Sequence, residues 1–261
     1  MQRSNTKWIL PLATLVGLTM GGCKKDKDVS PAPGGGGGTP ITSQIALSFD
    51  FRKGTEPFAL GGTVVDADGR LVRITKLRFF LSGIEAENDE GEVIGDYEGV
   101  YILADASSDA EFALGTISGN HVHQLHFNLG VDSATNHTDM TTFTEPPLND
   151  PTATWMWNQD FGYKFIDIEG DFDADNNGTV DPGEGSFQAH IAGDDLLTPG
   201  HAHVHADLVA GGTFVAPIVV DVEGLFSGVQ MTGAMHMDLL GTTPRTTQIM
   251  LNLAAGIDGP E

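Results

Sequence analysis

The sequence predicts an all-β fold, an antiparallel two-sheet β-sandwich with long loops. Short runs of residues alternate between apolar and polar side chains, which is the period of a strand with one buried face. The 34 Gly and 13 Pro residues favour many turns and short strands. No run of the sequence shows a sustained helical period with caps, so the hydrophobic 40% of the residues is expected to fill a core between sheets.

The predicted strands follow one another along most of the chain. In the first, residues 45–51, the odd-numbered side chains are Ile, Leu or Phe and the even-numbered ones are small or polar. Comparable runs lie at residues 62–65, 71–81, 101–104, 122–129, 163–168, 186–191, 203–208, 214–222 and 235–239. Loops rich in Gly, Asp, Asn and Pro separate them. Residues 249–253 alternate in the same way and predict a final strand.

Net charge and cysteine content exclude a nucleic-acid partner and a disulfide framework. The chain has 13 Lys and Arg against 36 Asp and Glu, a formal net charge of -23, which repels the phosphates of nucleic acids. We therefore expect no nucleic-acid partner. The single Cys excludes an intrachain disulfide framework.

The N-terminus resembles a bacterial lipoprotein signal. A basic head with Arg3 and Lys7 precedes an apolar stretch over residues 8–18, which is too short to span a bilayer. The sequence LTMGGC at 18–23 resembles a lipobox, so Cys23 is expected to carry a lipid such as palmitate. The predicted organisation is a signal peptide at 1–22, a flexible Lys-, Pro- and Gly-rich tether at 23–40 and a domain at 41–261. We expect an outer-membrane lipoprotein that faces the periplasm or the cell surface.

One loop has the ligand spacing of an EF-hand calcium site. Its ligand positions 1, 3, 5, 7, 9 and 12 are Asp173, Asp175, Asn177, Thr179, Asp181 and Glu184. A hard cation needs several oxygens at once, and Gly178 permits the sharp turn between them. The flanking residues resemble strands instead of helices, so we expect calcium to brace a loop. An acidic surface turn is the alternative.

The histidines suggest a second kind of metal site. All nine lie between His121 and His236. Alternate residues of a strand share a face, so neighbouring imidazoles there can reach one ion, as in many copper and zinc sites. His121 and His123 are predicted to continue the core-facing row of residues 125, 127 and 129, and His190 is predicted to lie beside His201 or His203 across a hairpin. The candidate copper ligands are His121, His123, His190, His201, His203 and His205. Isolated surface or core histidines are the alternative.

Several motifs together resemble a known family. They are NLGVD at 128–132, NH at 136–137, PPLN at 146–149, WMW at 155–157 and GYKF at 162–165. Residues 77–82 and His190 resemble two further segments of the same pattern. In this order the motifs are similar to the MbnP-like copper-binding domain family, and the resemblance covers most of the chain from residue 45 onward.

The resemblance implies an extracytoplasmic β-sandwich that binds copper. A binding site without a nucleophile, base and oxyanion constellation favours carriage or storage, so we expect no enzyme activity. Some relatives bind copper through His and a Trp oxidised to kynurenine, and some are encoded beside a dihaem enzyme, so a dihaem cytochrome peroxidase-like partner is implied. Here His121 stands two residues before His123, where such a relative carries the modified Trp. That departure argues against kynurenine at this position.

Two other function classes stay open. A surface adhesion or glycan-contact lipoprotein could use calcium to shape its loops, with the histidines incidental. A superoxide dismutase-like copper enzyme is suggested by the sequence His-Val-His at 121–123, although the Cys pair of that family is absent from this sequence. The leading hypothesis is a calcium-stabilised, lipid-anchored protein for copper carriage, storage or uptake.

Overall fold

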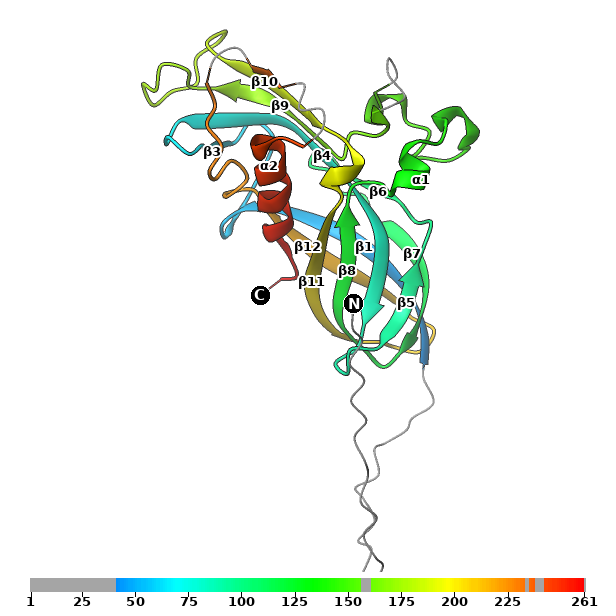
Figure 1. The fold of residues 1–261 in the computed structure, drawn as a ribbon. Coiled ribbons are helices and arrows are strands. Elements are labelled where there is room, and N and C mark those ends of the chain that lie inside the picture. The colour runs from blue at the N-terminus through cyan, green and yellow to red at the C-terminus, as the bar shows by residue number, and fades with distance from the viewer. Residues whose placement is uncertain (1–40, 156–160, 233–234, 238–241, 261) are drawn as a thin grey trace, which may run out of the picture. The chain divides into compact units, whose positions relative to one another are not determined.

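A computed structural model describes residues 41–155, 161–232, 235–237 and 242–260. Within these residues the main regular structure is strands of two open sheets, which confirms the all-β sandwich (Figure 1). The predicted signal peptide, Cys23 and the tether lie outside the described residues, as do Met156 and Trp157. Among the described residues, none of the helices has the length and apolar character that crossing a membrane requires.

The first sheet is built on the N-terminal strand. Its members are β1 (Ile41–Lys53), β2 (Glu56–Pro57), β7 (Phe112–Gly119), β12 (Thr213–Asp221) and β14 (Ile257–Asp258). β1 pairs in parallel with β12 on one side and antiparallel with β7 on the other. Ile45, Leu47 and Phe51 are buried, as the alternation in the sequence predicts.

The second sheet is organised by the long strand β4. Its members are β3 (Thr63–Val65), β4 (Leu71–Glu87), β5 (Val93–Tyr97), β6 (Ile102–Asp105), β8 (His121–Leu129), β9 (Ile166–Phe172), β10 (Ser186–Ile191), β11 (Thr198–Asp207) and β13 (Met235–Met237). Its main order is β11, β8, β4, β9, β10, β13. The first half of β4 pairs with β9 and the second half with β8, so β9 and β8 lie at different ends of one strand.

Aromatic side chains join the two sheets. The Phe79 ring on β4 contacts Phe49 and Phe51 on β1, with centroids 6.0 and 6.3 Å away. Phe79 is fully buried, and burying such a side chain stabilises the fold by roughly 1.5–3 kcal/mol. Gly170 of β9 lies so close to β4 that an added Cβ would come within 1.9 Å of the Arg73 carbonyl oxygen. The close approach of β9 to β4 therefore requires glycine at this position.

The predicted C-terminal strand at 249–253 is wrong, because these residues belong to helix α2 (Pro244–Ala255). The helix begins with a capping box in which Thr243 and Thr246 satisfy each other's backbone N–H groups, and Pro244 occupies the first turn. Its buried side chains have helical spacing, whereas Leu251, which alternation would have buried, is 51% exposed. Other short helical turns within the described residues are α1 (Ser133–Asn136), η1 (Met140–Thr142), η2 (Pro151–Ala153) and η4 (Asp194–Leu196).

Candidate metal centre

Strands β8 and β11 run side by side (Figure 1), and together they contribute six histidines. We call them the histidine row: His121, His123, His126, His201, His203 and His205. The antiparallel register places His201 directly opposite His126, and Asp207 opposite His121. Residues opposite each other in an antiparallel pair share a face of the sheet. Two segments distant in the sequence thus present their imidazoles on one surface.

An irregularity in each strand creates this surface. The register of β11 shifts between His203 and Ala206, and His205 has a positive φ of 42°. Such a bulge places an extra residue opposite its partner strand and changes the direction of a side chain. On β8, both Val122 and Leu125 are buried, so the alternation breaks between them.

The break on β8 corrects the predicted core-facing row. His121 and His123 are half-buried and do not continue the fully buried side of the strand. They lie on the surface of the histidine row instead. The prediction failed because it assumed strict alternation through 121–129, and the irregularity is set by pairing with the neighbouring strands.

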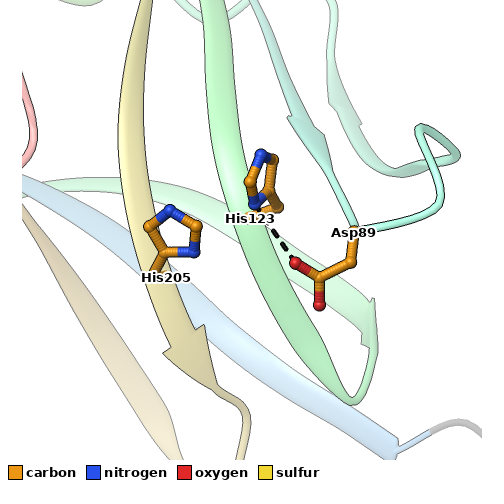
Figure 2. A group of neighbouring side chains, drawn as sticks. All are labelled: Asp89, His123 and His205. Atoms are coloured by element: carbon orange, nitrogen blue, oxygen red, sulfur yellow. Dashed lines mark ion pairs between the residues drawn. The ribbon is translucent and has the colours of Figure 1, made fainter.

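His123 and His205 form the closest pair of the row. Their ring centroids are 4.5 Å apart. Asp89, from the turn between β4 and β5, completes a group in which one atom of each residue lies within 4.8 Å of the others (Figure 2). The Asp89 carboxylate is 3.2 Å from Nδ1 of His123. That nitrogen is shielded from water and has no hydrogen-bond partner among the described residues, so it is available to a ligand.

The ring spacings match coordination of one ion. Two imidazoles on a tetrahedral ion, with metal–nitrogen bonds of about 2.0 Å, hold their centroids roughly 5 Å apart. The pairs His123–His205 and His201–His203 are at 4.5 and 5.2 Å. His126 and His201 are 6.5 Å apart, so joining them through one ion would require their side chains to move.

Carboxylates contact the outer imidazoles of the row. Nδ1 of His121 is 2.9 Å from Asp207, and Nε2 of His126 is 3.1 Å from Glu87. A carboxylate on one ring nitrogen fixes the ring orientation and the tautomer, a common support of metal-binding histidines.

The prediction that His190 lies beside His201 or His203 is wrong. β10 and β11 are consecutive strands of the second sheet but not a hairpin, because β9, β4 and β8 lie between them (Figure 1). Nε2 of His190 instead lies 3.2 Å from a carboxylate oxygen of Asp167 and 3.3 Å from one of Glu169, both on β9. The centroids of the His190 and Trp155 rings are 5.2 Å apart.

The site around His190 is a network of compensated charges. The buried Asp167 carboxylate contacts Arg78 at 2.7 Å and Lys76 at 2.9 Å. Burial opposes ionisation of Asp167, but hydrogen bonds from His190, Arg78 and Lys76 hold its pKa well below its usual range. These cations already neutralise the acidic groups, so a metal ion would have to compete with them.

The predicted calcium loop lies between the antiparallel strands β9 and β10. Asp173, Asp175 and Glu184 each place one oxygen within 4.8 Å of the others. Asp173 accepts hydrogen bonds from the N–H groups of Asn177 and Gly178, and Glu184 accepts from those of Asp175 and Asp181. The loop therefore curls around its first and last carboxylates.

The other predicted calcium ligands make hydrogen bonds within the loop. The side-chain oxygen of Asn177 accepts hydrogen bonds from Thr179, and Asp181 contributes its backbone N–H to Glu184. Loss of water and the neighbouring Glu184 carboxylate raise the pKa of Asp175. The acidic groups thus repel each other, and a cation between them would relieve that repulsion.

Sequence reasoning missed the carboxylates around the histidine row. Asp89 and Asp258 belong to separate segments and carry no local motif, whereas Asp207 ends the strand of His201, His203 and His205. Asp207 does continue the alternation of 201–205 and could have been found in that way. Asp89 and Asp258 are brought to the row only by strand pairing.

Comparisons with known proteins identify the family. A family model described as MbnP matches residues 42–243. No curated protein matches the chain. Among solved structures, MbnP from Methylosinus trichosporium is similar, with 14% sequence identity, coverage of 80% of this chain and 87% of that one, and a TM-score of 0.49. Because the family model matches well over half of its residues, the chain belongs to the MbnP family.

Proposed function

We propose that the protein is an extracytoplasmic, lipid-anchored copper-binding protein that carries, stores or takes up copper and is stabilised by calcium. Membership of the MbnP family supports copper as the cargo, because the motif pattern of the sequence resembles copper-binding members. The histidine row supplies ligands of the kind that copper prefers.

The main observation that supports this proposal is the group formed by Asp89, His123 and His205. Three ligand atoms within 4.8 Å of one another can bind one ion with small side-chain movements. Nδ1 of His123 is shielded from water and makes no hydrogen bond among the described residues, so an ion at this position would satisfy it in its unprotonated form. Imidazole nitrogens suit copper and zinc, so the donor set fits the proposed cargo.

Exposure of this site favours exchange of the ion over permanent burial. The Asp89 side chain is 57% exposed and His205 also reaches solvent. A partner could approach the row and take over ligands one at a time. Binding and release of this kind need no catalytic step, so we propose that the protein is not an enzyme.

Calcium is proposed to brace the loop at 173–184. Neighbouring carboxylates and the EF-hand spacing support this assignment. Because the loop connects β9 with β10, calcium would hold the end of that pair together.

The membrane anchor and the haem partner rest on the sequence. The lipobox-like segment supports lipidation of Cys23 in an outer membrane, and the family resemblance supports a dihaem cytochrome peroxidase-like partner. The anchor is tested by expression in a lipoprotein-processing bacterium, where Cys23→Ser should move the protein from the detergent phase to the aqueous phase.

Copper titration of the purified chain tests the main proposal. We expect His123→Ala to lower copper affinity at least tenfold. His137→Ala is the matched control, since His137 contacts Asp194 and lies outside the row. Equal affinity in the two variants would contradict the proposal. Calcium binding with no copper affinity above that of a histidine peptide would favour the adhesion alternative.

A further inference from the structure

His203 lies beside the proposed ion site without belonging to its closest group. Its ring centroid is 5.9 Å from that of His123 and 6.2 Å from that of His205. These separations are somewhat larger than the roughly 5 Å expected for two imidazoles on one tetrahedral ion. A small rotation of the His203 side chain would therefore add it to the same ion.

The C-terminal segment contacts His203. One carboxylate oxygen of Asp258 accepts hydrogen bonds from the His203 backbone N–H at 2.8 Å and from the Gly259 N–H at 2.8 Å. The same oxygen is 3.1 Å from Nδ1 of His203. The contact is tight, because a Cβ on Gly259 would come within 1.5 Å of the His203 carbonyl oxygen.

The first sheet fixes the position of Asp258. Residues Ile257–Asp258 form β14, which pairs with β12, and Asp258 lies opposite Val219. Ile257 is buried, with 3% exposure. The carboxylate that contacts the histidine row of the second sheet is thus held by the first.

The chemistry of the contact sets the tautomer of His203. An ionised carboxylate only accepts hydrogen bonds, so Nδ1 of His203 carries the proton. In a neutral imidazole Nε2 then keeps the lone pair, which a metal ion requires. Without Asp258, the proton could occupy either nitrogen.

We propose that Asp258 is a positioning residue of the histidine row, which prepares His203 to bind the ion through Nε2 together with Asp89, His123 and His205. This inference rests on the proposed copper-binding function. It assigns to the C-terminal segment a role in a site whose other residues lie at 89–205. Asp258 itself does not touch the ion.

Two measurements on the full chain test this role. The first is nitrogen-15 NMR of the histidine rings in the metal-free protein, which reports each tautomer directly. The second is titration with Cu(I) and Cu(II). The variants are Asp258→Ala, which removes the acceptor, and Asp258→Asn, which keeps an acceptor oxygen. Asp109→Ala is the control for loss of one exposed negative charge.

The expected result is an Nδ1–H tautomer of His203 in the wild type and in Asp258→Asn, and a mixture of tautomers in Asp258→Ala. Copper affinity should fall about 10- to 100-fold in Asp258→Ala, the usual effect of losing such a supporting carboxylate. It should largely recover in Asp258→Asn and stay unchanged in Asp109→Ala.

An Nε2–H tautomer of His203 in the wild type would overturn the inference, even if Asp258→Ala failed to fold. So would equal copper affinities in Asp258→Ala and Asp109→Ala. The wild-type tautomer does not depend on copper, so failure of the proposed function is seen separately, as a wild type with the Nδ1–H tautomer and no copper affinity.

Discussion

The imidazole rings of His123 and His205 meet edge to face, with their planes at 83°. The two residues come from strands that are far apart in the sequence and adjacent in the sheet. The contact depends on a backbone irregularity, because His205 sits at the bulge of β11 with a left-handed conformation. A non-glycine residue in that region costs about 1 kcal/mol or more, and such strain tends to occur at functional sites.

Replacing His205 should separate backbone strain from metal binding. Asn tolerates the left-handed conformation better than Ala does. We therefore expect His205→Asn to have a higher melting temperature than His205→Ala, while both lose copper affinity at least tenfold. Thermal unfolding and copper titration check this prediction. Copper affinity that survives in either variant would exclude His205 as a ligand.

One substitution in the calcium loop should lower stability only when calcium is bound. Asp175→Asn removes a charge next to Glu184 and keeps an oxygen for the Asn177 N–H. We expect it to leave calcium-free stability unchanged or slightly higher and to reduce the melting shift produced by calcium. Asp173→Asn is the comparison, since the buried Asp173 carboxylate also organises the loop backbone. Equal calcium-induced shifts in wild type and Asp175→Asn would contradict calcium binding here.

The buried carboxylate of Asp167 should make stability depend on pH. Its pKa is lowered by the fold, so its contribution is present above the unfolded-state pKa of about 3.9 and is lost as the pH falls toward the lower folded-state pKa. Asp167→Asn should cost about 3–5 kcal/mol at pH 7, because it leaves Arg78 and Lys76 without this partner. It should also flatten the loss of stability below pH 4.

Urea unfolding at several pH values measures both effects. Asp171→Asn is the control on the same strand, since its ion pair with Arg73 is partly exposed and should contribute at most about 1 kcal/mol. Similar losses at pH 7 in the two variants would show that burial of Asp167 is unimportant.

The contact between β9 and β4 should not tolerate a methyl group at Gly170. The added Cβ would overlap the Arg73 carbonyl, so Gly170→Ala must separate the strands and should cost about 3 kcal/mol or more. Gly224→Ala is the control, because its Cβ would meet no atom within 4 Å. Chemical denaturation checks the difference. Two equally stable variants would contradict the observed spacing.

The sequence was sufficient for the sheets but not for the way their strands are arranged. Alternation at 45–51 predicts β1 correctly, because one face of that strand packs on the core throughout. The same rule fails at residues 249–253, where a capping Thr243 and Pro244 begin a helix. A short run of alternating apolar residues is compatible with a strand or with a helix. The helix cap is the signal that distinguishes the two.

The candidate site shows the same limit. Spacing placed His201, His203 and His205 on one face, yet the pairing of His123 with His205 depends on a bulge that only the neighbouring strand determines. Spacing also led to the wrong position for His190, because it assumed that consecutive strands are neighbours. Asp89 and Asp258 reach the row through turns and pairings that no local pattern indicates.

The parallel pairing of β1 with β12 has a consequence for biogenesis. A chain synthesised or exported from its N-terminus releases residues 41–53 well before their partner at 213–221. Until then β1 keeps an unpaired, apolar edge, which is a template for aggregation. Contacts this distant in sequence also form slowly. We therefore expect the nascent protein to need a holding chaperone until β12 has emerged.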